Sequence, residues 1–296
     1  MALVLGSFCQ ECYQSLMNLY RSKHAGKPPT GKNLTWLRLY IAYRLYEQFT
    51  WPVYLKMDAV KQMKNTLFPG ESFQTEARLV FRFDSLDAVP WILQQCQIYV
   101  ISVDNRTVAL VSHSLSRLYP VLKDTPGVKT LTIPPTIQHS VALQTITQDG
   151  ESLRLALAYE SKMFHAFCNR QRFIQGHNER VRFPKKPLAW RCGPVDMVQQ
   201  GAQLQWDMML ETEREIYLIE AKMDVTRSTF NIRQLFYPAL FWNNFFAQYG
   251  IEKTIHTIFF TYKRATNVYT LRQFEFNDMT DITSWHVTKS ASYTLQ

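Results

Sequence analysis

The sequence predicts a folded chain of mixed α/β class, divided into two domains. Its 296 residues are enough for two domains that each bury a core. The composition is 46% hydrophobic and 19% charged, which excludes a disordered chain. Two patterns indicate the class: apolar residues recur at helical spacing early in the chain, and polar and apolar residues alternate in later segments.

The first part of the chain has a helical pattern. Apolar residues such as Leu34, Leu37 and Ile41 recur at spacings of three and four residues between Cys9 and Phe68. This segment predicts two or three helices, and Pro69-Gly70 predicts the turn that ends it.

A small mixed unit is predicted next, because the hydrophobic pattern changes from helical spacing to alternation. The expected elements are a strand over Arg78–Phe83, a short helix over Leu86–Gln95 and strands over Gln97–Val103 and Thr107–Ser112.

A proline-rich stretch then separates the domains. Two successive prolines, Pro134-Pro135, cannot lie inside a helix or a central strand. We therefore expect a helical and mixed N-terminal domain over residues 1–140 and a second domain over residues 141–296. A helix from Glu151 to about Phe167 opens the second domain.

Two strands of the second domain form a predicted hairpin. Polar and apolar residues alternate from Gln203 to Leu210, which indicates a strand with one polar face. Residues 212–215 predict a turn, and Ile216–Met223 is rich in residues that favour strands. If Glu211 pairs with Ile216, the register gives two facing pairs: Asp207 with Glu220, and Gln205 with Lys222.

Paired carboxylates at that separation repel each other unless a cation lies between them. Hard oxygen ligands favour Mg²⁺, with Mn²⁺ as a possible substitute. Lys222 projects from the same face as Glu220 and would place an ammonium beside the metal. The alternative is a solvated strand face, since a Glu and a Lys two residues apart are common on surfaces.

The order of these residues resembles the PD-(D/E)xK nuclease superfamily: Asp207 comes first, Glu220-Ala-Lys222 follows at the end of an apolar strand, and a helix bearing Asn231–Pro238 comes next. Within it, the chain resembles type II restriction endonucleases. The resemblance implies a restriction-endonuclease-like core, with a central mixed β-sheet flanked by helices. The chain departs from the motif at Trp206, the residue before Asp207, where the motif has proline. Further segments resemble family elements: the helix starting at Glu151 and the strands Thr257–Tyr262 and Tyr269–Phe276.

The resemblance also implies roles. Asp207 and Glu220 would be metal ligands, the Ala221 carbonyl a possible third, and Lys222 would position and polarise the attacking water. Glu151 would be a further catalytic residue near the metal, either as another ligand or as a group that orients water. Gln234 would reach the edge of the site or a phosphate, or else is a solvent-facing helix residue.

Nucleic acid is the expected partner. The net charge is +9, and residues 169–191 hold seven Lys/Arg against one acid. Such a segment suits phosphate contact, although a charge run is often only a solvated loop. The candidate DNA-binding residues are Arg170, Arg172, Arg182, Lys185, Lys186, Arg227, Arg233 and Gln234.

These features together predict a Mg²⁺-dependent endonuclease of double-stranded DNA, with a homodimer expected and a cognate DNA methyltransferase implied. The alternatives are a repair or mobile-element nuclease and a non-catalytic DNA-binding protein that retains the fold. The sequence has no apolar run long enough to span a membrane, and its start lacks the features of a signal peptide.

Five cysteines, an odd number, suit reduced thiols in a cytoplasmic protein. Cys9 and Cys12 are expected as two buried thiols on a helix, with half a zinc site as the alternative.

Overall fold

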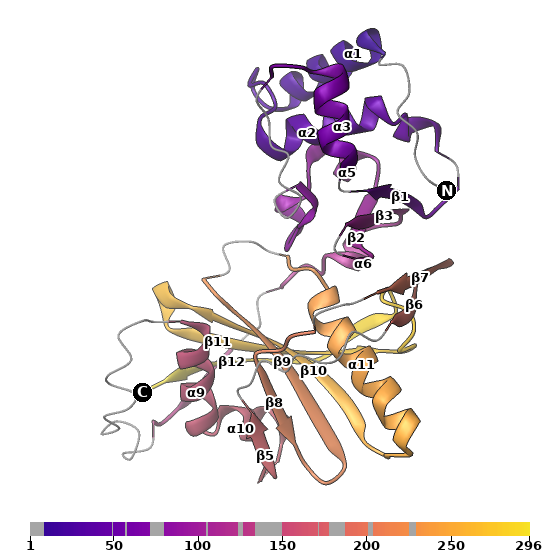
Figure 1. Cartoon of the computed structure of the whole chain (residues 1–296). Helices are drawn as coiled ribbons and strands as arrows, with labels where there is room; N and C mark the ends of the chain where they lie inside the picture. Colours follow the sequence, from indigo (N-terminus) through magenta and orange to yellow (C-terminus); the bar gives the residue numbers. More distant parts are fainter. Residues whose placement is uncertain are drawn as a thin grey trace. The chain divides into compact units, whose positions relative to one another are not determined.

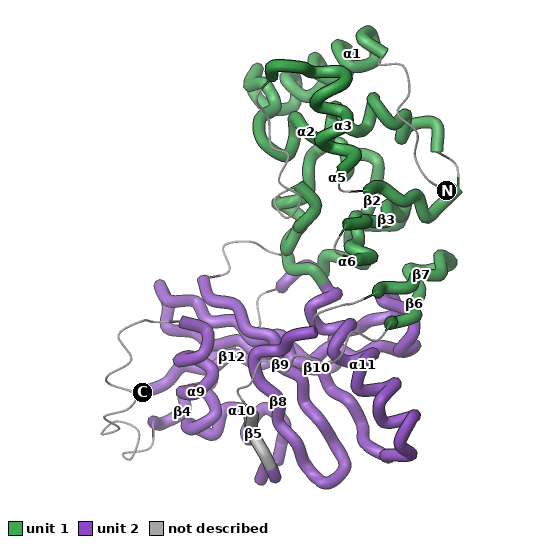
Figure 2. The backbone as a smooth tube through the Cα atoms, in the orientation of Figure 1, with its two compact units in different colours: residues 1–120, 185–202, 229–231 green, residues 121–184, 203–228, 232–296 purple. Residues whose placement is uncertain are grey.

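The chain consists of two compact units that are not continuous in sequence (Figure 2). Unit 1 contains residues 1–120, 185–202 and 229–231, and unit 2 contains residues 121–184, 203–228 and 232–296. The computed structural model describes residues 9–48, 50–56, 58–71, 80–104, 106–123, 127–133, 150–170, 172–177, 187–200, 204–224 and 229–296. The first change of unit follows Pro120, and the expected boundary near residue 140 lies outside the described residues.

Unit 1 combines helices with a small antiparallel sheet of order β1-β3-β2 (Figure 1). Its helices are α1 (Gln10–Lys23), α2 (Gly31–Ala42), α3 (Asp58–Leu67), α5 (Trp91–Gln95) and α6 (Leu115–Leu118), with short 3-10 turns at Leu45–Glu47 and Leu86–Ala88. Its strands are β1 (Val53–Lys56), β2 (Ile98–Ser102), β3 (Thr107–Ser112) and the separate hairpin β6 (Leu188–Cys192) and β7 (Val195–Gln199).

Two segments from later in the chain are built into unit 1. In the turn between β6 and β7, Gly193 has φ +58° and lies so close to His113 that a Cβ would be 2.9 Å from its Nε2. Asn231 is buried and donates its side-chain amide to Phe83 O at 3.0 Å, while Tyr99 Oη donates to Asn231 Oδ1 at 2.7 Å. The hydrogen bonds of Asn231 hold its segment within the unit, and the N–H of Gln200, after β7, donates to Val103 O at 2.8 Å and holds the other.

Unit 2 contains, within the described residues, a seven-stranded mixed sheet of order β4-β12-β11-β10-β9-β8-β5. The pairs β9–β10 and β4–β12 are parallel, and the other neighbouring pairs are antiparallel. The strands are β4 (Val128–Leu131), β5 (Gln175–His177), β8 (Met208–Glu211), β9 (Glu215–Met223), β10 (Thr254–Lys263), β11 (Val268–Phe276) and β12 (Trp285–Leu295). The helices are α9 (Glu151–Glu160), α10 (Met163–Cys168) and α11 (Arg233–Tyr249), with a 3-10 turn at Arg264–Thr266.

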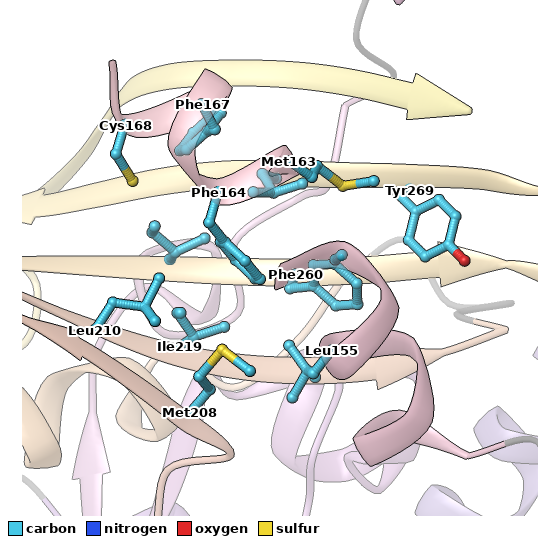
Figure 3. Packing of buried hydrophobic residues seen from close by; sticks show 14 of the residues in the cluster. Leu155, Met163, Phe164, Phe167, Cys168, Met208, Leu210, Ile219, Phe260 and Tyr269 are labelled. Atoms are coloured by element: carbon cyan, nitrogen blue, oxygen red, sulfur yellow. The ribbon is translucent and has the colours of Figure 1, made fainter. Parts of the chain in front are cut away.

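One face of this sheet carries a cluster of buried hydrophobic residues (Figure 3). Leu155 of α9 and Phe164 of α10 pack against a face that includes Ile219 of β9 and Phe260 of β10. Burial of these apolar side chains stabilises the unit by roughly 1.5–3 kcal/mol for each fully buried one. The alternation of strand residues sends their neighbours, Glu220 among them, to the opposite face.

Helix α11 packs on that opposite face. Phe236 contacts Phe276 of β11, with ring centroids 5.2 Å apart, and Gln234 hydrogen-bonds to Glu220. The mixed α/β class, with a mixed sheet flanked by helices, is therefore confirmed, because α9 and α10 cover one face and α11 covers the other.

Several expected elements differ in detail. Residues 80–83 form no strand, and the helix expected from Glu151 to Phe167 is broken at Lys162, whose left-handed φ of 62° separates α9 from α10. The strand expected from Gln203 begins only at Met208. No helix in the described part of the chain is long and apolar enough to cross a bilayer.

Candidate active site

The candidate site is built on the hairpin of β8 and β9. The strand ladder starts at the pair Glu211–Ile216, beside the turn at 212–215, and ends at the pair Met208–Ile219. The turn residues predicted this register, and the pairing continues without a shift from the first pair to the last. The apolar side chains of the two strands, such as Met208 and Ile219, therefore lie on the same face of the sheet, as the sequence predicted.

Asp207 lies one residue before β8, just outside this ladder. Its N–H donates to Ile219 O at 2.9 Å, and its Oδ2 accepts the N–H of Ala221 at 2.7 Å. The Asp207 carboxylate thus accepts the Ala221 N–H, which a backbone carbonyl would accept if the strands continued to pair. The two expected facing pairs, Asp207 with Glu220 and Gln205 with Lys222, are both wrong, because the ladder ends at the pair Met208–Ile219 and residues 204–206 form no strand.

Glu220 is the buried carboxylate of the site, with 7% of its surface exposed. Burial raises the pKa of Glu220 to about 8, and the nearby charges of Asp207 and Glu151 act in the same direction. Lys222 opposes this shift by favouring the ionised carboxylate. A cation close to Glu220 would relieve the same electrostatic cost.

Lys222 already supplies one positive charge there. Its Nζ donates to Glu220 Oε1 at 2.6 Å and to Ala221 O at 2.9 Å. Burial alone would lower the pKa of Lys222, but attraction to the carboxylates outweighs burial and the pKa is raised. The ammonium therefore remains charged and fixed at the end of β9.

Gln234, the second residue of α11, completes the polar group. Its Nε2 donates to Glu220 Oε1 at 2.8 Å, so this helix residue reaches the site and does not face solvent alone. Its Oε1 is buried and has no hydrogen-bond partner within the described residues. A buried amide oxygen without a donor costs about 1–3 kcal/mol, so a water or another donor at this place would stabilise the site.

The residues fit a hard divalent cation in part. Asp207, Glu220 and the Ala221 carbonyl offer the oxygen ligands that Mg²⁺ prefers. The buried oxygen of Gln234 could accept a hydrogen bond from water held by such an ion. Among the described residues, however, no three His, Cys, Asp or Glu side chains gather closely enough to hold a metal by themselves. An ion here would need backbone and water ligands as well.

Glu151 lies near this group without touching it. It stands in the first turn of α9, and its charge raises the pKa of both Glu220 and Lys222. Within the described part of the chain, no hydrogen bond or ion pair joins Glu151 to either residue.

Sequence reasoning missed Thr261 as a neighbour of the site. In the parallel pairing of β9 with β10, Thr261 lies beside Lys222, and its hydroxyl accepts a hydrogen bond from Arg272 Nη1 at 3.3 Å. Thr257 and Thr261 are four residues apart and so share one face of β10, and this spacing was the available signal.

The candidate DNA-binding residues have different environments. Arg170 binds Glu215 through two of its nitrogens, with Nε 2.6 Å from Oε2, so its charge is already paired. Arg172 is exposed, and Arg233 is partly buried at the first position of α11. The remaining candidates, Arg182, Lys185, Lys186 and Arg227, lie outside the described residues.

Comparison with known proteins gives a family but no activity. A family model described as "Domain of unknown function (DUF6997)" matches residues 117–294. No curated protein and no solved structure matches the chain. The matched segment includes every residue of the candidate site, from Glu151 to Gln234.

Proposed function

The chain belongs to the DUF6997 family, and we propose that the site on its β8–β9 hairpin is that of a metal-dependent DNA endonuclease. The observation that carries this proposal is the position of Lys222. Its ammonium lies against Glu220 and the Ala221 carbonyl, while Asp207 is fixed to the N–H of the same residue, Ala221. A carboxylate pair with an adjacent lysine at the end of a buried strand suits hydrolysis of a phosphodiester.

In the proposed reaction each side chain would have its own task. Asp207 and Glu220 would hold Mg²⁺ together with the Ala221 carbonyl. The bound ion would act as a Lewis acid and would favour the ionised form of a coordinated water. Lys222 would orient the attacking water and offset the negative charge that grows on the phosphate. Gln234 would fix Glu220 through its Nε2 and accept a hydrogen bond from water through its Oε1.

Within the class of metal-dependent DNA endonucleases, we propose a type II restriction endonuclease with a restriction-endonuclease-like core. It is supported by the PD-(D/E)xK-like residues and by the net charge of +9, which favours a polyanionic substrate. Cleavage of both strands of a duplex normally takes two active sites, so a homodimer belongs to the proposal. A cognate methyltransferase would protect the host DNA.

A second candidate function, non-catalytic DNA binding, is favoured by the contacts of the same lysine. Lys222 Nζ occupies Glu220 Oε1 and Ala221 O, two of the atoms that the metal would need. In a non-catalytic DNA-binding protein, Lys222 and Glu220 would be a structural ion pair, and the buried carboxylate would never bind Mg²⁺.

Incubation with a panel of plasmid and phage DNA, with Mg²⁺ or with EDTA, tests the proposal. Discrete fragments that require Mg²⁺ support a restriction enzyme, and smears indicate a non-specific nuclease. Glu220→Gln should abolish cutting, whereas Glu252→Gln, a change of an exposed acid, should not. Mobility shifts without cleavage under all conditions would overturn the endonuclease and favour the binding protein.

A further inference from the structure

Cys9 and Cys12 form a disulfide at the start of α1, whereas the sequence suggested two buried thiols or half a zinc site. Their Cα atoms are 5.4 Å apart, within the usual range for a disulfide. Both side chains are partly exposed, so solutes can reach the sulfurs. This pair takes no part in the proposed nuclease site.

The other three cysteines are not disulfide-bonded. Cys168 and Cys192 are buried, and burial raises the pKa of Cys168 to about 12, which keeps its thiol unreactive. Cys96 is partly exposed, and its thiol donates to Tyr40 Oη at 3.2 Å. The described chain therefore contains one bonded pair and three thiols outside it. The reactivity of Cys9 and Cys12 can be compared with that of these three thiols in the same protein.

A bridge between residues three apart adds little to folding stability. The stabilisation from a disulfide grows with the length of the loop that it closes, and only two residues lie between Cys9 and Cys12. A structural bridge would join distant parts of unit 1. The short spacing suits a pair that exchanges between dithiol and disulfide.

The environment distinguishes the two sulfurs. Cys9 is the N-cap of α1, and its Sγ accepts the backbone N–H of Cys12 at 3.2 Å. In the reduced pair, the same N–H and the amino end of the helix favour a thiolate on Cys9. Cys12 lies inside the first turn, where it can attack the sulfur of Cys9.

We infer that Cys9 and Cys12 are a thiol–disulfide exchange site whose co-reactant is a low-molecular-weight disulfide. The Cys9 thiolate attacks one sulfur of R–S–S–R and expels RS⁻, which leaves a mixed disulfide on Cys9. The Cys12 thiolate then attacks Cys9 Sγ and expels the second RS⁻. The protein loses two electrons and two protons, and the small disulfide becomes two thiols.

Intact mass and peptide mapping of the full chain test this inference, with glutathione and glutathione disulfide as the probe. The reduced protein should lose two hydrogens and gain a bridge between residues 9 and 12, reversibly as the buffer is changed. Cys12→Ser should accumulate one glutathionyl group on Cys9. Cys9→Ser should be modified at Cys12 at least about tenfold more slowly, because Cys12 lacks the capping N–H. Cys96→Ser, the matched control, should behave as wild type.

Three results would overturn the inference. A bridge that glutathione cannot reduce would be structural. Stoichiometric Zn²⁺ bound through Cys9 and Cys12, with no bridge formed, would restore the zinc alternative. Equal rates in Cys9→Ser and Cys12→Ser would remove the role assigned to Cys9.

Discussion

The backbone N–H of Ala221 donates to Oδ2 of Asp207, so the acid before β8 is fixed to the strand that carries Glu220 and Lys222. The hydrogen bond is 2.7 Å long and replaces a bond of the strand ladder. Asp207 therefore has two separable properties, a charge and a hydrogen-bond acceptor, and substitutions can remove one or both.

Asp207→Asn and Asp207→Ala should both lose cleavage by several orders of magnitude, because both remove a charge from the proposed metal ligands. Asp207→Asn retains an oxygen for the Ala221 N–H, so its stability should be near that of wild type. Asp207→Ala leaves that N–H without its acceptor and should be less stable by about 1–3 kcal/mol. Urea unfolding and single-turnover cleavage would measure the two effects. Near-normal cutting by either variant would contradict the assignment.

Glu220 should make stability depend on pH. Its folded-state pKa is raised from 4.5 to about 8, so its stabilising contribution is complete below the unfolded value and is lost as the pH rises through about 8. Glu220→Gln removes this dependence. The unfolding free energy of the variant relative to wild type should therefore increase by at most about 3–5 kcal/mol between about pH 5 and pH 9. A constant difference across this range would contradict the raised pKa.

Mg²⁺ should stabilise the protein more at higher pH, because the ion competes with a proton for Glu220. The Mg²⁺-dependent increase in melting temperature should be larger at about pH 8.5 than at about pH 6.5. Glu220→Gln should show little increase at either pH, and Glu252→Gln should behave as wild type. An equal response of Glu220→Gln and wild type would place the ion elsewhere.

Lys222→Met should reduce cleavage by at least about 10²–10³-fold while DNA binding is retained, since the substitution removes the group that steadies the attacking water. It also removes the charge that lowers the pKa of Glu220, so the pKa of this carboxyl should rise further and the group should stay protonated at neutral pH. The loss of stability should then be small near pH 7 and larger in alkaline solution. Thermal melts at both pH values, run beside a cleavage assay, would measure this. Unchanged cleavage would contradict the catalytic role of the lysine.

Arg172→Ala should weaken DNA binding more than Arg170→Ala, because Arg172 is exposed and Arg170 is paired with Glu215. If Arg172 contacts a phosphate, its loss should flatten the slope of log K against log salt by about 0.9. Arg170→Ala should instead lower stability, since the Arg170 hydrogen bond holds the pKa of Glu215 below its usual value. Titrations at several salt concentrations would compare the two, and equal slopes would contradict this distinction.

The hairpin and its register could be predicted from sequence because they depend on local signals. The turn at residues 212–215 and the alternation beside it determine how β8 and β9 pair. The strand β12 was missed, because most residues of its first half are exposed and show no alternation of burial. The break between α9 and α10 was missed too, since the left-handed residue there is Lys162 and not a glycine.

The site was only partly predictable for the same reason. Asp207, Glu220 and Lys222 lie on one hairpin, so local spacing brings them together. Gln234 was expected only through the family resemblance, because it reaches Glu220 from α11 through packing that no local pattern encodes. Thr261, the neighbour of Lys222 in the pairing of β9 with β10, was missed for the same reason. The protonation preference of Glu220 also depends on burial by the whole unit.

A single cut in the chain cannot separate the two units. Residues 185–202 and 229–231 leave unit 2 on either side of the β8–β9 hairpin and fold with the N-terminal residues. A fragment that starts at residue 121 would keep Phe230 and Asn231 but lose Phe83 and Tyr99, which bury and bind Asn231. A truncation at residue 120 therefore removes the residues that enclose Asn231, so the remaining fragment should expose a buried polar side chain and aggregate more readily than the full chain.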